Sequence, residues 1–257
     1  MNILAIGDVV GKDGVTFLAE HLPSLKRDNA IDVCIINGEN AADGNGITPT
    51  AAADLFALGA DVVTTGNHAF RRRELYDVYD ENEFLLRPAN FTAACPGHGY
   101  CRVDKGRVQV GVVNLMGTTY MEPLDNPFNM VDAILEELSD CRIVLVDFHA
   151  EATSEKRAMG FYLDGKVSAV FGTHTHVQTA DEQVLPKGTG YITDLGMTGT
   201  VQSVLGVQPD IIIEKFKTNM PARFDYAKNS ENMVNGCIFT VDEKTGQCTG
   251  VKRILLK

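Results

Sequence analysis

The chain has 257 residues, of which 44% are apolar and 22% charged, as in ordinary globular proteins. Its formal net charge of −11 argues against a nucleic-acid polymer as partner, although bound cations would still allow a small phosphorylated ligand. No apolar run is long enough to cross a bilayer and MNILAIGD does not resemble a signal peptide, so we expect a cytoplasmic protein with no membrane partner.

Six segments share one pattern, a short apolar run followed at once by polar residues. They are residues 2–8, 32–40, 60–68, 108–114, 142–149 and 167–176. Apolar runs without alternation are typical of strands that are covered on both faces. Between them, helices are predicted at residues 14–28, 48–59 and 126–140. Pro23 should kink or split the first helix, and Thr48 followed by Pro49 should begin the second.

The pattern changes after residue 205. Residues 209–216 (PDIIIEKF) and 236–256 are predicted to form antiparallel strands, with a turn at 243–246. Together with the alternating strands and helices before them, they predict an α/β fold with a mixed sheet and a mainly parallel core. We expect one domain spanning residues 1–257. The six cysteines show no Cys-x-x-Cys spacing, so neither a disulfide framework nor a zinc knuckle is expected.

Polar side chains with donor atoms follow five of the predicted strands, and four of the six histidines are among them. Ligands of open α/β sheets bind beyond the carboxyl ends of the strands. The donors at these ends are Asp8, Glu39, Asn40, Asn67, His68, His149, His174 and His176. Carboxylate, amide and imidazole without thiolate suit manganese, iron or zinc. The set is too large for one cation, so it predicts two cations about 3.5–4 Å apart that share a carboxylate.

Each of these residues also has an ordinary interpretation. Asp8 alone could cap a helix, residues 37–40 could form a turn, and His149 could be a hydrogen-bonded core histidine. Metal-bound imidazoles usually need carboxylates to fix them. Asp147, Asp181 and Asp194 are close enough in sequence for this role, but each could equally be a loop residue. The conjunction of so many donors at strand ends favours the metal centre.

Five motifs resemble those of the calcineurin-like metallophosphoesterases in their order and spacing. They are GDVVG (7–11), NGEN (37–40), GNHAF (66–70), DFHAEATSEK (147–156) and GTHTHVQTAD (172–181). Three positions depart from that pattern: Val10 replaces a histidine, Glu39-Asn40 replaces an aspartate, and Ala69 replaces an acid. These departures, together with NGENAADGNGIT (37–48) and YITDLGMTG (191–199), are similar to the YmdB-like branch of the superfamily.

The resemblance implies a layered α-β-β-α sandwich with mixed, largely parallel core sheets. It also implies a dinuclear-metal phosphodiesterase that acts on small cyclic nucleotides of the 2′,3′-cAMP type and has links to bacterial regulation. Iron or manganese is expected, and zinc would also fit. Glu39 would bridge the metals, with Asp8, Asn40 and His176 on one metal and Asn67, His149 and His174 on the other. A hydroxide held between the cations would attack phosphorus, and His68 would be the general acid.

Two other functions remain open at this stage. One is a phosphomonoesterase or nucleotidase on the same metal centre, and the other is a metal-dependent regulatory binder with little turnover. For either enzyme the partner is a small phosphorylated nucleotide substrate, whereas the binder would hold a nucleotide or a protein partner. A homo-oligomer is left open. The basic run at residues 71–73 is either part of a solvated helix or a basic lip that attracts phosphate.

Overall fold

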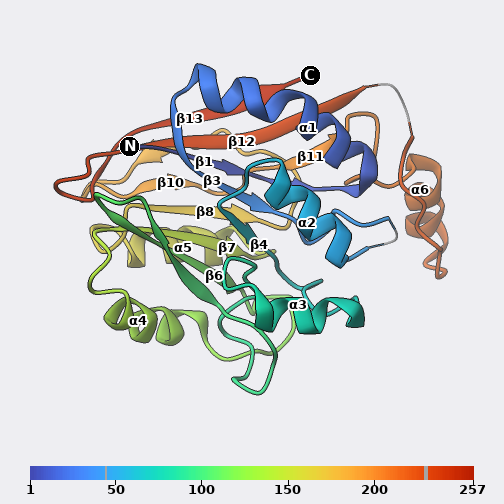
Figure 1. Cartoon of the computed structure of the whole chain (residues 1–257). Helices are drawn as coiled ribbons and strands as arrows, with labels where there is room; N and C mark the ends of the chain where they lie inside the picture. The colour runs from blue at the N-terminus through green and yellow to red at the C-terminus, as the bar shows by residue number, and fades with distance from the viewer. Residues whose placement is uncertain (44, 229–230) are drawn as a thin grey trace.

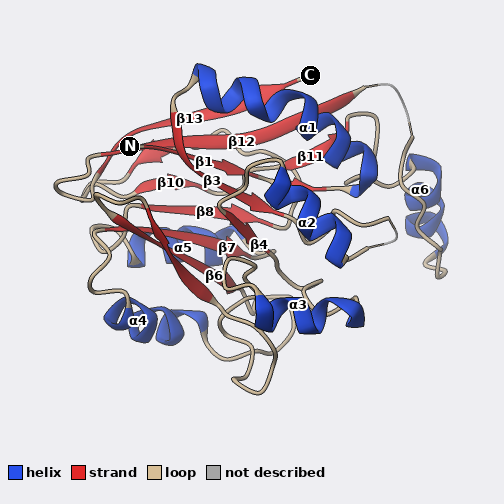
Figure 2. Cartoon of the chain, in the orientation of Figure 1, coloured by secondary structure: helices blue, strands red, loops and turns tan. Residues whose placement is uncertain are grey.

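The computed structural model describes residues 1–43, 45–228 and 231–257. Its strands form two stacked sheets with helices on both outer faces (Figures 1 and 2). The first sheet has the order β2 (Asp8–Val9), β11 (Met197–Thr200), β12 (Asn232–Val241), β1 (Asn2–Ile6), β3 (Ile31–Asn37) and β4 (Val62–Thr64), and β13 (Cys248–Leu256) also pairs with β12. The second has the order β5 (Tyr100–Asp104), β6 (Gln109–Met116), β7 (Ile143–His149), β8 (Ala169–Thr173), β10 (Gly190–Ile192) and β9 (Gln183–Val184).

Parallel pairing dominates where the predicted donors are carried. In the first sheet β1, β3 and β4 are parallel neighbours, and in the second β6, β7, β8 and β10 are parallel neighbours. Antiparallel pairs join β12 to β1, β11 and β13, and they also lie at both edges of the second sheet. The sheets are therefore mixed, as predicted.

Alternating apolar side chains divide the core into three layers. Along β1, Ile3 and Ala5 pack between the two sheets, whereas Leu4 and Ile6 pack beneath the helices of the first sheet. On the other sheet, Val113 and its neighbours pack beneath another pair of helices. Strands that are apolar on both faces are needed for this arrangement, which explains the uninterrupted apolar runs. The predicted α-β-β-α fold is confirmed.

The helices cover the outer faces of the sheets. α1 (Gly11–Asp28) and α2 (Pro49–Ala57) lie on the first sheet, and α4 (Pro127–Glu137) and α5 (Thr153–Tyr162) lie on the second (Figure 1). Thr48 caps α2 by accepting a hydrogen bond from Ala51, as predicted. α1 is continuous through Pro23, so the predicted split is wrong. Within residues 1–43, 45–228 and 231–257, no helix is both long and apolar enough to span a membrane.

Residues 209–216 are a helix, not the predicted strand. They form most of α6 (Pro209–Thr218), which lies beside the sheets (Figure 1). Three consecutive isoleucines favoured a strand, but Pro209 occupies the first helical turn and Asn219 ends the helix in a left-handed conformation. Residues 236–256 do form the predicted hairpin of β12 and β13.

The six cysteines are all free thiols, and five of them, including Cys34 and Cys141, are buried. This agrees with the expected absence of a disulfide framework. Burial raises the pKa of the Cys34 thiol to about 12. The buried cysteines therefore behave as small apolar residues of the core.

Candidate metal centre

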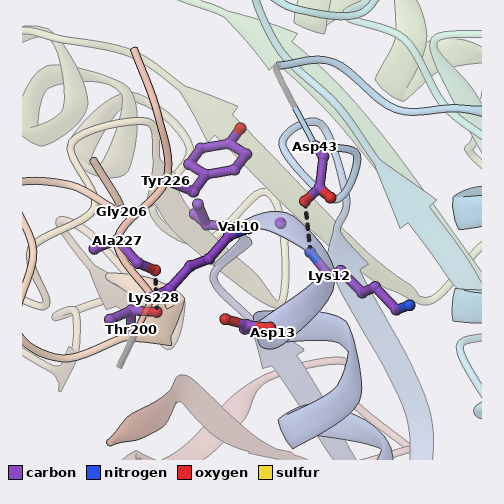
Figure 3. Close-up of a pocket in the computed structure, with 10 residues that line it drawn as sticks. Val10, Lys12, Asp13, Asp43, Thr200, Gly206, Tyr226, Ala227 and Lys228 are labelled. Atoms are coloured by element: carbon purple, nitrogen blue, oxygen red, sulfur yellow. Dashed lines mark hydrogen bonds between the residues drawn. The ribbon is translucent and has the colours of Figure 1, made fainter. Parts of the chain in front are cut away.

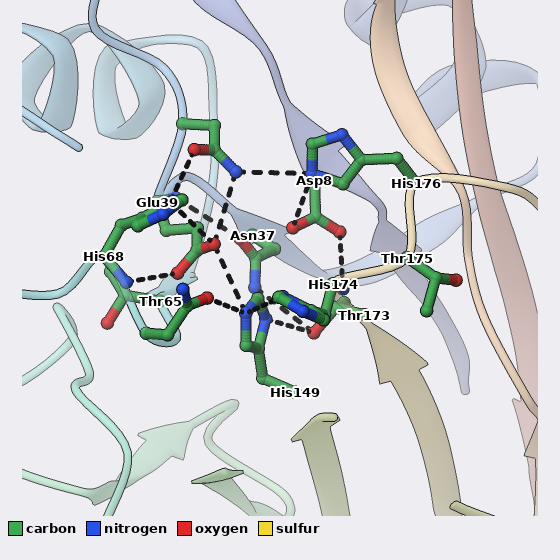
Figure 4. Close-up of polar contacts among 12 residues, drawn as sticks. Asp8, Asn37, Glu39, Thr65, His68, His149, Thr173, His174, Thr175 and His176 are labelled. Carbon is green, nitrogen blue, oxygen red and sulfur yellow. Dashed lines mark hydrogen bonds and ion pairs between the residues drawn. The ribbon is translucent and has the colours of Figure 1, made fainter. Parts of the chain in front are cut away.

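The predicted donors converge at the carboxyl ends of five strands (Figure 4). Asp8 follows β1, and Glu39 and Asn40 follow β3. Asn67 and His68 follow β4 in the same sheet. The second sheet contributes His149 at the end of β7, and His174 and His176 just after β8. Parallel strands that end at one edge bring these residues together although they are separated by up to 168 positions in the chain.

One half of the centre surrounds the Nε2 atom of His149. This atom lies 2.9 Å from Asn67 Oδ1 and 3.1 Å from His174 Nδ1. It is also 3.3 Å from Glu39 Oε1. Four potential ligand atoms at four strand ends of two sheets thus lie close together. Glu39, His149 and His174 together satisfy the geometry of a group that could hold a metal ion.

The other half surrounds His176. Its Nε2 atom lies 3.3 Å from the amide nitrogen of Asn40 and 3.5 Å from Asp8 Oδ1. The same amide nitrogen donates to Glu39 Oε1 at 3.2 Å. Glu39 therefore lies between the two halves, next to both His149 and Asn40.

The two carboxylates carry negative charge in a nearly dry place. Asp8 and Glu39 are 0% and 1% exposed. Burial alone would raise the pKa of each, but the imidazole of His176 lowers that of Asp8 and the imidazole of His149 lowers that of Glu39. Among the described residues Asp8 Oδ1 has no donor at normal hydrogen-bond geometry, and its ion-pair neighbour His176 Nε2 is 3.5 Å away. A buried charged oxygen without a donor is costly unless a cation is near it, so the residues fit bound metal ions.

Two hydrogen bonds behind His149 decide which of its ring nitrogens faces the centre. They form a chain, called the relay below, that runs from Asp147 through Thr173 to His149. Thr173 donates its hydroxyl hydrogen to Asp147 at 2.7 Å, so the same oxygen must accept from His149 Nδ1 at 3.0 Å. With Nδ1 bonded to Thr173, Nε2 is the nitrogen that faces Asn67 and Glu39, and it would bind a metal ion after losing its proton. Of the three acids considered as orienting groups, Asp147 thus acts on His149 through a threonine.

Asp181 and Asp194 differ in what they contact. Asp181 accepts from the backbone and hydroxyl of Thr193 and pairs with Arg157 at 3.5 Å, so it orients none of the imidazoles. Asp194 contacts Thr175, which lies between His174 and His176.

The neighbouring imidazoles of His149 and His174 have opposite shifts. Burial lowers the pKa of both, but the carboxylate of Glu39 reverses this for His149 and raises its pKa to about 9. The charge on His149 lowers the pKa of His174 further, to about 3. His149 therefore carries a proton while His174 is neutral. The positive charge on His149 lies at the place where a cation would bind.

His68 lies at the rim, with 20% of its side chain exposed. Its Nδ1 atom is 2.8 Å from Asn40 Oδ1, and its Nε2 atom is 3.3 Å from the side-chain nitrogen of Asn45. Arg72 holds Asn45 in turn, because its Nε donates to the Asn45 carbonyl at 2.9 Å. Ala69 stands where the superfamily pattern has an acid and cannot hydrogen-bond to His68. Asn45 contacts the His68 ring instead.

Of the basic run at residues 71–73, only Arg73 lies in a helix. A short 3₁₀ helix, η1 (Arg73–Leu75), and α3 (Tyr76–Glu81) follow Arg72. Arg72 directs its guanidinium to the backbone carbonyls of Asp43 and Asn45. This arginine therefore fixes the neighbouring loop, and its bonded N–H groups are not free for phosphate.

The sequence patterns missed three contacts. Thr173 and Asn45 orient His149 and His68, and Glu151 lies 3.1 Å from His174 Nε2. Thr173 and Glu151 stand next to predicted ligands, so proximity in the chain could have suggested them. Asn45 had no such signal, because it reaches His68 from a separate loop.

A hollow with a volume of about 170 Å³ lies beside the start of α1 (Figure 3). Lys12, Asp43 and Tyr226 are among the residues that line it. The predicted metal donors do not line this hollow, and the Lys12 backbone N–H already donates to Asp43 at 3.3 Å. It is therefore separate from the candidate metal centre.

Comparison with known proteins agrees with the fold and the motifs. The sequence profile described as "YmdB-like protein" matches residues 4–254. The chain is 46% identical over 257 residues to the 2′,3′-cyclic-nucleotide 2′-phosphodiesterase of Bacillus subtilis (strain 168), covering all of this chain and 97% of that protein.

Two solved structures match over the whole chain. A hypothetical protein from Thermus thermophilus has a TM-score of 0.93 at 40% identity, with 99% of its chain covered. A novel phosphatase from Mycoplasma pneumoniae has a TM-score of 0.94 at 33% identity, with 93% covered. Sequence and fold agree over nearly the full length, and the chain therefore belongs to the YmdB-like family.

Proposed function

We propose that this protein is a dinuclear-metal-dependent phosphodiesterase that hydrolyses small cyclic nucleotides of the 2′,3′ type. The observation that carries the proposal is the convergence of carboxylate, amide and imidazole donors around Glu39, in two groups. The substrate class is taken from the name of the Bacillus subtilis relative, which is 46% identical over this whole chain.

Each group of donors would hold one cation. The first cation would be bound by Asn67, His149 and His174. The second would be bound by Asp8, Asn40 and His176, and Glu39 would bind both. Two observations support this division: the buried Asp8 Oδ1 lacks a close hydrogen-bond donor among the described residues, and the Thr173–Asp147 contact orients His149. When bound, such a cation pair activates water and neutralises charge on the phosphoryl oxygens. The donor types suit iron or manganese, and also zinc.

His68 would provide the proton for the leaving ribose oxygen. It is more exposed than Glu39 or His149, so it can reach a substrate that lies over the centre. A leaving alkoxide needs a proton, and a positioned imidazole typically contributes about 10²–10⁴-fold in rate. Its contacts with Asn40 and Asn45 hold the ring in place at that rim.

The test compares three substrates on the same manganese-loaded protein: a 2′,3′-cyclic nucleotide, a bis-ester dye and a monoester dye. We expect turnover of the cyclic nucleotide, followed by separation of its products. Activity confined to the monoester would contradict the proposal. Failure to hydrolyse any of the three, with bound metal measured in the same sample, would instead favour the regulatory binder.

A further inference from the structure

The turn that carries His174 and His176 has an unusual backbone. His174 has φ 96° and His176 has φ 63°, which are left-handed conformations that non-glycine residues rarely adopt. Such conformations persist only where surrounding contacts hold them. The contacts of this turn therefore decide where both imidazoles lie.

A carboxylate holds the residue between the two histidines. Asp194, which follows β10, accepts from the Thr175 backbone N–H at 3.2 Å and from the Thr175 hydroxyl at 2.7 Å, both at Oδ2. Its Oδ1 accepts from the Gly196 N–H at 2.8 Å, which fixes the carboxylate in turn. Thr175 points away from the other labelled side chains in Figure 4, and its hydroxyl is the group that contacts Asp194.

A buried lysine holds the residue before His174. The Nζ atom of Lys156, on α5, donates to the Thr173 carbonyl at 2.8 Å and to Asp194 Oδ2 at 2.6 Å. The two charged side chains are only 2% and 1% exposed. The same ion pair thus holds the carbonyl before His174 and the N–H after it.

We infer that Lys156 and Asp194 are positioning residues that keep the His174–His176 turn in the conformation needed for metal binding. This role rests on the proposed function, because it assumes that both imidazoles are ligands. It also assigns a role to one residue in each of two motifs, Lys156 in DFHAEATSEK and Asp194 in YITDLGMTG. A buried ion pair is weak support for stability by itself, so a purely structural role must be tested directly.

The chain contains a matched control. Lys105 donates to Asp61 at 2.7 Å, and Asp61 also accepts a backbone N–H, that of Cys34, at 2.8 Å. This pair resembles the first in its bonding groups and contacts none of the predicted ligands, but it is less buried, with 25% and 22% of its side chains exposed. The double variants Lys156→Met/Asp194→Asn and Lys105→Met/Asp61→Asn each remove an ion pair without leaving an isolated buried charge.

The experiment is calorimetric titration of the full-length apoprotein with Mn²⁺, with circular dichroism to verify folding and cobalt absorption spectra to report coordination. We expect Lys156→Met/Asp194→Asn to lower Mn²⁺ affinity by about 10- to 100-fold and to change the cobalt spectrum. Lys105→Met/Asp61→Asn should bind as the unmodified protein does. Unchanged affinity and spectrum in Lys156→Met/Asp194→Asn would overturn the inference.

A third variant decides the case if the first fails to fold. Thr175→Val removes only the hydroxyl bond to Asp194, so a measurable fall in Mn²⁺ affinity would support the inference and no change would overturn it. The readout also separates the two proposals. Unmodified protein that binds Mn²⁺ but leaves cyclic nucleotides intact would refute the proposed function alone, whereas protein that binds no metal would refute both.

Discussion

A Cβ atom on Gly66 would lie 2.2 Å from the imidazole of His149. The first residue of the GNHAF motif therefore leaves room for a ring that comes from the other sheet. We expect Gly66→Ala to move the His149 ring and to lower both Mn²⁺ binding and turnover. Metal analysis and calorimetry would measure this loss. Gly250→Ala is the control, because its Cβ would meet Thr240 at an ordinary 3.8 Å. Unchanged metal binding in Gly66→Ala would show that His149 is not a ligand.

The adjacent residues Asn67 and His68 should give different phenotypes. Asn67 Oδ1 lies beside His149 Nε2, so Asn67→Ala is expected to lose one metal ion and nearly all turnover. His68→Ala should keep both metals and lose about 10²–10⁴-fold in rate. Metal content and kcat measured on the same preparations would distinguish them. An empty centre in His68→Ala would mean that the division between ligand and acid is wrong.

The relay behind His149 makes a third prediction. Asp147→Asn keeps the shape of the side chain, but its amide can donate to Thr173 and so reverse the hydrogen bond that fixes His149. We expect metal affinity to fall by about 10- to 100-fold. Asp164→Asn is a suitable comparison, since this buried acid accepts only from the Lys187 backbone N–H among the described contacts. Equal metal affinities in Asp147→Asn and Asp164→Asn would show that the hydrogen bonds from Asp147 through Thr173 to His149 do not contribute to metal binding.

The loop that holds His68 can be tested without touching the metals. Asn45→Ala removes the partner of His68 Nε2, and Arg72→Ala releases the Asn45 carbonyl. Both should lower kcat by about tenfold, less than loss of His68 itself, and leave metal content unchanged. Arg73→Ala, an exposed neighbour in η1, should have little effect. If Asn45→Ala retained full kcat, Asn45 would not orient the acid.

Sequence patterns predicted the fold where periodicity and chain order were sufficient. The apolar runs before Asp8 and before His149 are buried strands, and their ends meet because parallel strands share one edge. The pattern failed at residues 209–216, where three isoleucines outweighed the helix-start signal of Pro209. Propensity alone could not decide this segment, since most of its apolar side chains are not buried.

Sequence reasoning offered Asp147 and Asp194 as orienting acids, but it could not identify the other supporting contacts of the centre, because these depend on tertiary proximity. Lys156 had no role in the sequence analysis beyond standing at the end of DFHAEATSEK, yet it is buried against Thr173 and Asp194. Asn45 reaches His68 across 23 positions. The metal ligation itself stays a prediction, which the variants above would test.

The place of β12 in the first sheet has a consequence for biosynthesis. β12 pairs with β1, and the Gly7 N–H just before Asp8 donates to the Asn235 carbonyl of β12 at 3.0 Å. All of the predicted metal donors precede residue 177, so a ribosome would synthesise them before this strand. Pairing between such distant segments is slow to form. The nascent chain would therefore leave the segment before Asp8 without its partner strand until β12 has been synthesised.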